Sequence, residues 1–424
     1  MLDRILSALG KCGIEDYHIV VKDEQSAELF FIKKELDMQR LKKVQTADVS
    51  VYHVFEEGDN RFRGVASVQV QDSLTQPEME KLFADAYYAA GFVKNKYYDL
   101  YEGTKVGMVQ AKDPFGEKTL NEMVQGFAQA LFAEDVYKEV FINSAEIFAS
   151  RLTVHIRNSR GVDVSYNRSR VQGEFVVQCT SGQDVETYQD FSYNGWNLDA
   201  IREKARNTIE LTRARARATT APAAGEYRLI LSGGYVNEFM SYYVNRASSF
   251  AIHQKYSTFS AGCDVQGGEV SKDRVNMTMK SNVPFSDEGI PMKNRELVKD
   301  GKLMMIHGGN RFAQYLGIAP TGNFDGYKVE AGNVSIEQMK EQPYLEVVNF
   351  SDFQMDWFTG HFGGEIRLAF LYDGKTVTPV TGGSVNGNIF EAQKSLVFSK
   401  EMQVEKDFEG PKAVAMDGVS VAGI

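Results

Sequence analysis

The sequence predicts an α+β protein, with an N-terminal α+β domain followed by a mostly antiparallel β domain that has few helices. Three observations lead to this class. Alternating apolar runs, typical of half-buried strands, occur in both halves. Long helical patterns are found in the first half. The second half carries Asp-Gly pairs at 300–301 and 373–374 between apolar runs, which indicates antiparallel hairpins.

The first half opens with MLDRILSALGKCG, which is typical of an amphipathic helix, and the segment after it mixes strands with helices. Apolar alternation at 48–55 and 64–71 predicts a hairpin. A helix is predicted at 74–91, with a proline near its start and a glycine at its end, and further helices are predicted at 118–135 and 197–218. The stretch 136–182 between the last two helices is rich in strand-forming residues.

A linker separates the halves. TTAPAAG, at 219–225, is short, uncharged and made of small residues, so we place a boundary there, between domains 1–218 and 226–424. The chain of 424 residues is also too long for one small core. Short helices are predicted in the second domain at 234–247 and 386–396.

Composition narrows the possible functions. A net charge of −10 argues against a protein whose main task is to coat nucleic acid. No apolar stretch approaches the ~18–20 residues of a membrane span. Asp3 and Arg4 interrupt what would be the core of a signal peptide. The three cysteines form no CxxC pair, which argues against a disulfide framework or a zinc ribbon. We therefore expect a cytoplasmic protein.

One stretch, GGYVNEFMSYYVNRASSF at 233–250, follows a short strand and continues with helical periodicity. Its apolar positions predict one buried helical face. Glu238 is expected in the first turn, where the helix dipole favours a negative charge. The same charge argues against a phosphate site at this Gly-Gly turn.

Two further groups are candidates for a site. His253, His307 and His361 could converge as metal ligands, but sequence alone does not show whether they do. Asp287 and Glu288 form an acidic pair in a turn that leads into a strand. Carboxylates there are expected to accept hydrogen bonds from loop amides, and neighbours in sequence point apart, so no paired acid/base role is predicted.

The second half contains the run FSDEGIPMKNRELVKDGKLMMIHGGNRFAQYLGIAPTGN at 285–323. This run resembles the central signature of the TldD/PmbA family. Further similarities follow in order at 363–392 and 413–423, and VHIRNSRGVDVSY at 154–166 resembles a strand pair of the family. The resemblance implies an intracellular metallopeptidase system, for which an older name is modulator of DNA gyrase. It implies a zinc-bearing TldD-like subunit paired with a PmbA-like or TldE-like subunit that lacks the zinc ligands.

The family's HExxxH zinc helix corresponds here to a slot at 237–242. The glutamate is present as Glu238, but Asn237 and Tyr242 occupy the histidine positions. The late cysteine of the family is also missing, because 393–412 contains neither Cys nor His. An amide and a neutral phenol are poor zinc ligands. The resemblance therefore predicts no catalytic, cofactor or metal residues in this chain, and zinc only in a TldD-like partner.

Three functions stay open. The chain could be a non-catalytic PmbA/TldE-like subunit that supports cleavage of unstructured peptides by a zinc-bearing partner. It could be a metallopeptidase with a metal site rebuilt from the three histidines. It could also be a metal-free peptide-binding homodimer. The partner, the peptide and the task of the N-terminal domain cannot be predicted from the sequence.

Overall fold

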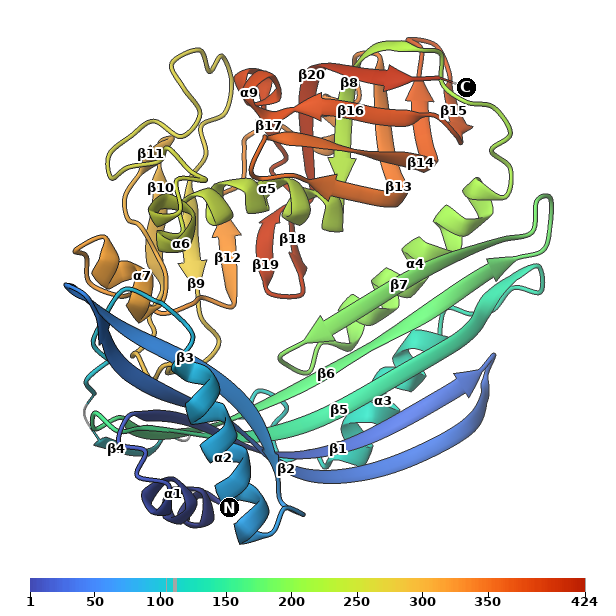
Figure 1. The fold of residues 1–424 in the computed structure, drawn as a ribbon. Coiled ribbons are helices and arrows are strands. Elements are labelled where there is room, and N and C mark those ends of the chain that lie inside the picture. The colour runs from blue at the N-terminus through green and yellow to red at the C-terminus, as the bar shows by residue number, and fades with distance from the viewer. Residues whose placement is uncertain (104, 110–112, 424) are drawn as a thin grey trace.

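In the computed structural model the chain forms an α+β fold with three β-sheets (Figure 1), as predicted. The structure describes residues 1–103, 105–109 and 113–423. One sheet is built from strands that precede the predicted linker, and the other two are built from strands that follow it. Between α4 and β8, residues 216–224 contain neither helix nor strand. The division into two domains stays a prediction.

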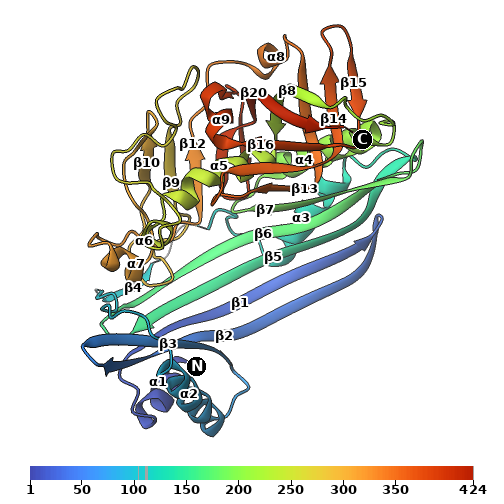
Figure 2. The same ribbon diagram turned by 45° about the horizontal axis from the view of Figure 1, so that its top comes forward.

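The N-terminal sheet is made of long, curved strands (Figure 2). Its order is β3-β2-β1-β5-β6-β4, and β7 pairs with the other end of β6. The predicted hairpin is confirmed and belongs to the longer strands β2 and β3. The bounds are β1 (Tyr17–Ile32), β2 (Glu35–Glu57), β3 (Asn60–Gln71), β4 (Lys105–Val109), β5 (Val140–Asn158), β6 (Asp163–Cys179) and β7 (Val185–Tyr193).

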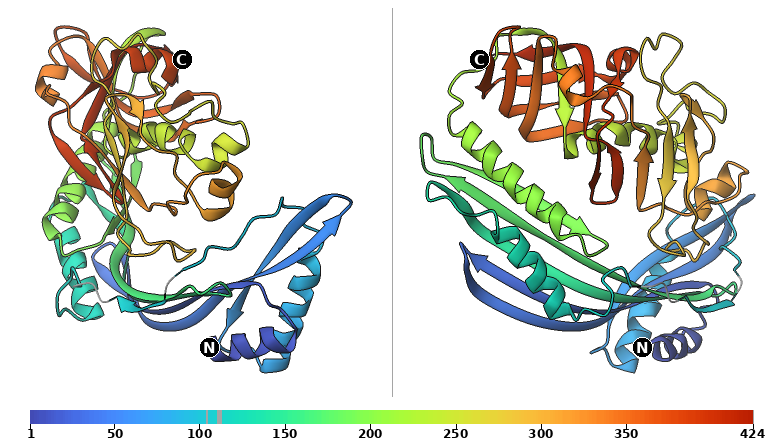
Figure 3. Two further views of the ribbon diagram at one scale, coloured as in Figure 1. Left: turned by 90° about the vertical axis from the view of Figure 1, so that its left-hand side faces the viewer. Right: turned by 180° about the vertical axis from the view of Figure 1, so that it is seen from behind.

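Four helices pack against this sheet in two pairs (Figure 3). The first pair lies near Ile19 and Val49, and the second near Ile147 and Val177, so two separate apolar cores form. The amphipathic first helix and the three longer predicted helices are confirmed. They are α1 (Leu2–Lys11), α2 (Gln76–Ala90), α3 (Leu120–Phe132) and α4 (Leu198–Arg215).

The C-terminal half contains the other two sheets, whose pairings are mostly antiparallel. The first has the order β11-β10-β9-β12-β19-β18, and the second the order β13-β8-β20-β16-β14-β15, with β17 beside β20. The bounds of the first are β9 (Met277–Lys280), β10 (Arg295–Lys299), β11 (Lys302–Leu303), β12 (Gly326–Val329), β18 (Met402–Glu405) and β19 (Phe408–Pro411). Those of the second are β8 (Gly225–Ser232), β13 (Tyr344–Met355), β14 (His361–Tyr372), β15 (Val377–Val380), β16 (Ser384–Asn388), β17 (Val397–Phe398) and β20 (Ala413–Ala422).

Both predicted Asp-Gly hairpins are confirmed. Asp300 and Gly301 have φ of 47° and 70° and connect β10 to β11. Two positive φ angles in a row are the geometry of the tight hairpin turn that Asp-Gly favours. Asp373 begins the longer turn between β14 and β15, where its Oδ1 accepts hydrogen bonds from the backbone N–H groups of Lys375 and Thr376.

Short helices connect these strands. The predicted helix at 234–247 is confirmed as α5, and its buried face packs in a core shared by both sheets, between residues such as Met277 and Val347. The helix predicted at 386–396 is shorter than expected, because β16 continues to Asn388 by pairing with β14. The bounds are α5 (Gly234–Arg246), α6 (Ser249–His253), α7 (Asn310–Tyr315), α8 (Ile336–Met339), α9 (Ile389–Ala392) and a 3-10 turn (Gln393–Ser395).

The tip of the β18–β19 hairpin joins the two halves. Lys204 Nζ lies 3.0 Å from Glu405 Oε1, and Lys406 Nζ lies 2.7 Å from Asp190 Oδ2. Each of these ion pairs links the hairpin to α4 or β7. No helix within the described residues combines the length and the apolar character needed to cross a membrane.

A second junction is formed by the 281–291 loop and α7. Phe285 packs in a small apolar cluster with Val154 and Val164 of the N-terminal sheet. Gln314 Oε1 accepts a hydrogen bond from the backbone N–H of Asp99 at 2.9 Å. The halves are therefore held together at two separated places.

Candidate functional site

Helix α5 begins with a sharp turn from strand β8. Gly233 joins the two elements at φ 66°, a left-handed value that favours glycine. Its N–H donates to the carbonyl of Lys412 at 3.2 Å, and its carbonyl accepts from Gln403 Nε2 at 2.9 Å. The N-terminal end of α5 is therefore anchored to the β18–β19 region.

Glu238 does not lie in the first turn of this helix, so that prediction is wrong. The helix starts at Gly234, which makes Glu238 its fifth residue. One turn takes 3.6 residues, and the dipole acts mainly within the first turn. The side chain is exposed. The apolar face is confirmed, since Val236, Phe239 and Met240 are fully buried.

Asn237, at the first histidine position of the slot, accepts a hydrogen bond from another part of the chain. The hydroxyl of Tyr327 on β12 lies 2.6 Å from both the Oδ1 and the carbonyl oxygen of Asn237. Burial raises the pKa of Tyr327 well above its usual value, and the charge of Glu238 raises it further. The Tyr327 hydroxyl therefore stays protonated and donates a hydrogen bond to Asn237. The amide oxygen of Asn237 is occupied by this hydrogen bond within the fold.

Tyr242, at the second histidine position, is a core residue. Its side chain is 1% exposed, and its ring lies 6.3 Å from the ring of Phe259 and 6.2 Å from that of Phe390. Burial raises the pKa of the phenol, so it stays neutral. Within the described residues, its hydroxyl has no hydrogen-bond partner. A neutral phenol in an aromatic cluster is a poor metal ligand.

The residues of the slot therefore do not fit a zinc ion. Neither position offers an imidazole, and the segment 393–412 supplies no Cys or His. Among residues 1–103, 105–109 and 113–423, no three His, Cys, Asp or Glu side chains are grouped to hold a metal.

The three candidate histidines lie in different surroundings. His253 ends α6, and its ring packs 4.9 Å from the ring of Tyr315. His307 is buried, and its Nε2 lies 2.9 Å from the carbonyl of Val244; burial lowers its pKa. His361 begins β14 and is exposed. The structure does not assemble them into a metal site.

Comparison with known proteins gives the family of the C-terminal half. The family model for the PmbA/TldA metallopeptidase C-terminal domain matches residues 224–423. The C-terminal half is a PmbA/TldD-family domain. A protein named metalloprotease from Archaeoglobus fulgidus is 21% identical over 312 residues, which cover 65% of this chain and 70% of that relative.

Solved structures extend the likeness to the fold of the whole chain. TldE from Thermococcus kodakarensis has a TM-score of 0.75 at 16% identity, and the match covers 99% of this chain and 100% of that one. A proposed modulator of a DNA gyrase from Thermotoga maritima has a TM-score of 0.75 at 15% identity, with 99% of each chain covered. The likeness of fold to these two structures therefore includes the N-terminal half.

The PmbA/TldD-like signature also contains a residue whose role sequence analysis missed. Glu288 Oε2 accepts a hydrogen bond from the N–H of Asn310 at 2.8 Å, so the expected backbone amide partner belongs to the first residue of α7 and not to a loop. Burial, with a smaller contribution from the charge of the neighbouring Asp287, raises the pKa of Glu288 to about 7. Local sequence carries no signal for this shift, because the burial comes from segments distant in sequence.

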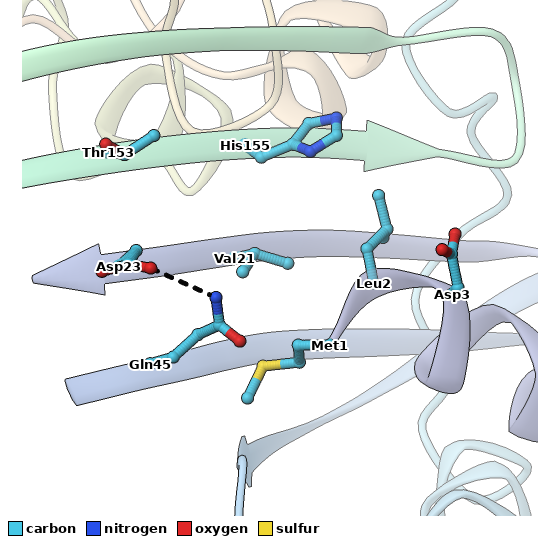
Figure 4. Close-up of a pocket in the computed structure, with 8 residues that line it drawn as sticks. All are labelled: Met1, Leu2, Asp3, Val21, Asp23, Gln45, Thr153 and His155. Carbon is cyan, nitrogen blue, oxygen red and sulfur yellow. Dashed lines mark hydrogen bonds between the residues drawn. The ribbon is translucent and has the colours of Figure 1, made fainter.

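Two pockets formed by described residues lie away from the slot on α5. One of about 410 Å³ opens on the N-terminal sheet beside α1 (Figure 4), where Gln45 Nε2 donates to Asp23 Oδ2. Another of about 680 Å³ lies on β13, β14 and β16. Neither is lined by a residue of α5. The first is lined by Met1, Leu2, Asp3, Val21, Asp23, Gln45, Thr153 and His155.

Proposed function

We propose that this chain is a PmbA/TldE-like, non-catalytic subunit of a cytoplasmic metallopeptidase system. In this role it supports the cleavage of unstructured peptides by a zinc-bearing, TldD-like partner. The observation that carries the proposal is the state of the slot on α5. Asn237 is bonded to Tyr327, and Tyr242 is buried among aromatic rings.

The chemistry of the slot supports inactivity of the chain alone. A zinc peptidase needs a metal that acidifies a water and polarises the peptide carbonyl, with a glutamate as general base. Glu238 remains available, but the two neighbouring positions offer an amide and a neutral phenol. Glu238 therefore has no acidified water from which to take a proton.

An edge strand near the slot supports a role in holding peptide. Strand β18 ends its sheet, and it borders the turn at Gly233 through Gln403. Val404 on β18 is 68% exposed. An extended peptide can add to such an edge through backbone hydrogen bonds, which read little of its sequence. We expect β18 to form part of the wall of a shared peptide site.

Reconstitution tests this function. The chain is co-expressed with a relative that carries an intact HExxxH helix, and the complex is tested for cleavage of an unstructured peptide. We expect a stable complex that cleaves, and no cleavage by this chain alone.

A matched pair of variants sharpens the test. Glu238→Gln in this chain should leave the activity of the complex unchanged, whereas the same change in the HExxxH of the partner should abolish it. If Glu238→Gln in this chain abolishes cleavage, or if the two proteins never associate, the proposal is wrong.

A further inference from the structure

A row of aromatic side chains lies on the surface beside the C-terminal end of α5. Helices α6 and α7 are neighbours at one end of the C-terminal half (Figure 1), and the turn between β13 and β14 approaches α6. Successive rings of the row are in contact, with centroids 5.2 Å apart for Phe312 and Phe250, 5.9 Å for Phe250 and Tyr256, 5.1 Å for Tyr256 and Phe358, and 3.8 Å for Phe358 and Trp357. We call these five rings the aromatic row.

The aromatic row is exposed to solvent. Phe250, Tyr256 and Phe358 are 42%, 45% and 48% exposed. Single exposed apolar side chains are ordinary on a protein surface, whereas contiguous ones mark binding sites. The rings belong to three segments that are far apart in sequence, so tertiary structure brings them together.

A buried arginine fixes the backbone under the aromatic row. Arg246, the last residue of α5, is only 7% exposed, and its Nη1 donates hydrogen bonds to the carbonyls of Tyr256 at 2.8 Å and Phe358 at 3.3 Å. Its Nη2 donates to the hydroxyl of Thr258 at 3.4 Å, so its acceptors in the described part of the chain are all neutral. A buried charge without a counter-charge costs free energy. The cost is tolerated here at a group that positions two exposed rings.

The backbone just before Tyr256 is strained. Lys255 has a φ of 61°, a left-handed value that residues other than glycine rarely adopt. This turn lets the N–H of Tyr256 donate to the carbonyl of Ala251 at 2.8 Å, and the ring then lies between Phe250 and Phe358. Such strain is concentrated at functional sites, where the surrounding structure holds it. The aromatic row is therefore a preformed surface.

Cationic side chains accompany the α6–α7 end of the aromatic row. The guanidinium carbon of Arg311 lies 4.4 Å from the centroid of the Phe312 ring, and Lys255 is exposed next to Tyr256. The carboxylate at the other end, Asp356, already accepts hydrogen bonds from within its own turn. Charge at the α6–α7 end therefore favours a ligand that carries acidic groups beside its apolar ones.

We propose that the aromatic row binds large apolar side chains of an unstructured peptide, and that Arg311 and Lys255 favour peptides with acidic residues beside the apolar ones. The choice of a peptide rests on the proposed function. The aromatic row adds a preference for certain side chains, which backbone pairing at β18 does not provide.

The spacing of the rings suits an extended peptide. Alternate side chains of an extended chain point to the same face and repeat about every 6.5–7 Å, so successive side chains can meet successive rings. Single-stranded nucleic acid fits less well, because its bases stack on exposed ring faces along a basic groove. Here the first four rings meet edge to face, at interplanar angles of 77°, 64° and 73°.

Binding of labelled peptides to this chain alone, followed by fluorescence anisotropy, tests the inference without any cleavage. The probe is a Gly/Ser-rich peptide with leucines flanked by glutamates, and its controls replace the leucines with serine or the glutamates with glutamine. We expect the probe to bind with a dissociation constant below about 100 μM. The serine control should bind about tenfold more weakly or worse, and the glutamine control about twofold to fivefold more weakly.

Variants of the chain locate the binding surface. Phe250→Ala and Phe358→Ala should each weaken binding of the probe about tenfold. Phe92→Ala, at a ring that is 69% exposed in the N-terminal half, is the matched control and should leave binding unchanged. Lys255→Gln should reduce the preference for glutamate over glutamine in the peptide. Circular dichroism and thermal unfolding check that each variant keeps the fold.

Several results would overturn the inference: no binding of the probe at about 100 μM chain, equal affinity for the serine control, or equal losses in Phe250→Ala and Phe92→Ala. Tighter binding of a single-stranded oligonucleotide would overturn the choice of ligand. The assay contains no zinc-bearing partner, so its failure leaves the reconstitution result intact. Conversely, a chain that never associates with such a partner can still show the peptide preference.

Discussion

Replacing Glu288 with Gln should change how the stability of this protein depends on pH. Burial raises the pKa of Glu288 from 4.5 to about 7 in the folded chain. The folded state therefore binds the proton more tightly than the unfolded state does. As pH rises from about 4.5 to about 7, the free energy of unfolding must fall, and the loss is complete above pH 7.

The size of this effect follows from the shift. Each pKa unit corresponds to about 1.4 kcal/mol, so the full contribution is about 3 kcal/mol, of which about 2 kcal/mol falls between pH 5 and pH 8. The groups that face Glu288 are Arg311 on α7, Asp287 beside it, and Tyr52 and Tyr98 from the N-terminal half. The carboxylate thus titrates at the junction of the two halves.

The assay is urea unfolding of the unsubstituted chain and Glu288→Gln at about pH 5 and about pH 8. The glutamine oxygen can still accept the N–H of Asn310, but it cannot ionise. Relative to the unsubstituted chain, the variant should gain about 2 kcal/mol between the two pH values. Glu341→Gln, on an exposed residue, is the control and should show no such gain. Parallel pH profiles for Glu288→Gln and the unsubstituted chain would refute the assigned shift.

Three other substitutions test the packing around α5 and the N-terminal sheet. Tyr327→Phe removes the hydrogen bond to Asn237 and should lower the free energy of unfolding by about 1 kcal/mol; no loss would show that the bond is not formed. Phe239→Ala empties a fully buried position and should cost about 3–5 kcal/mol, seen as a lower urea midpoint. Arg63→Met removes a buried positive charge that faces Asp16 and should lower the free energy of unfolding by about 3 kcal/mol. An unchanged melting temperature would show that this ion pair does not stabilise the fold.

Features determined by local chemistry could be predicted from the sequence. Thr75 and Thr119 are the N-cap residues just before α2 and α3, and each is followed three residues later by a glutamate that completes a capping box. The Asp300-Gly301 turn was predictable because few residue pairs adopt two positive φ angles easily.

Strand β1 could not be predicted, because its middle breaks the apolar alternation. The run 22–26 is polar, yet it continues between β2 and β5. Asp23 faces the pocket beside α1 rather than a helix (Figure 4). The alternation is lost because one apolar core contacts β1 before this run, at Ile19 and Val21, and the other contacts it after the run, at Ala27 and Leu29.

At the candidate site, the sequence indicates which residues occupy the slot but not what holds them. Asn237 and Tyr242 could be identified at the histidine positions from the resemblance alone. The bond from Tyr327 and the ring of Phe390 come from segments about 90 and about 150 residues away, and no local pattern joins them to α5. The raised pKa of Glu288 has the same origin in tertiary packing.

Zinc analysis of the purified chain tests the central claim most directly. The chain is incubated with zinc, exchanged into metal-free buffer and analysed for bound metal. Because Asn237 and Tyr242 cannot replace two histidines, we expect less than about a tenth of an equivalent. A content near one equivalent per chain, reduced by Glu238→Gln or by substitution of His253, His307 or His361, would contradict the account.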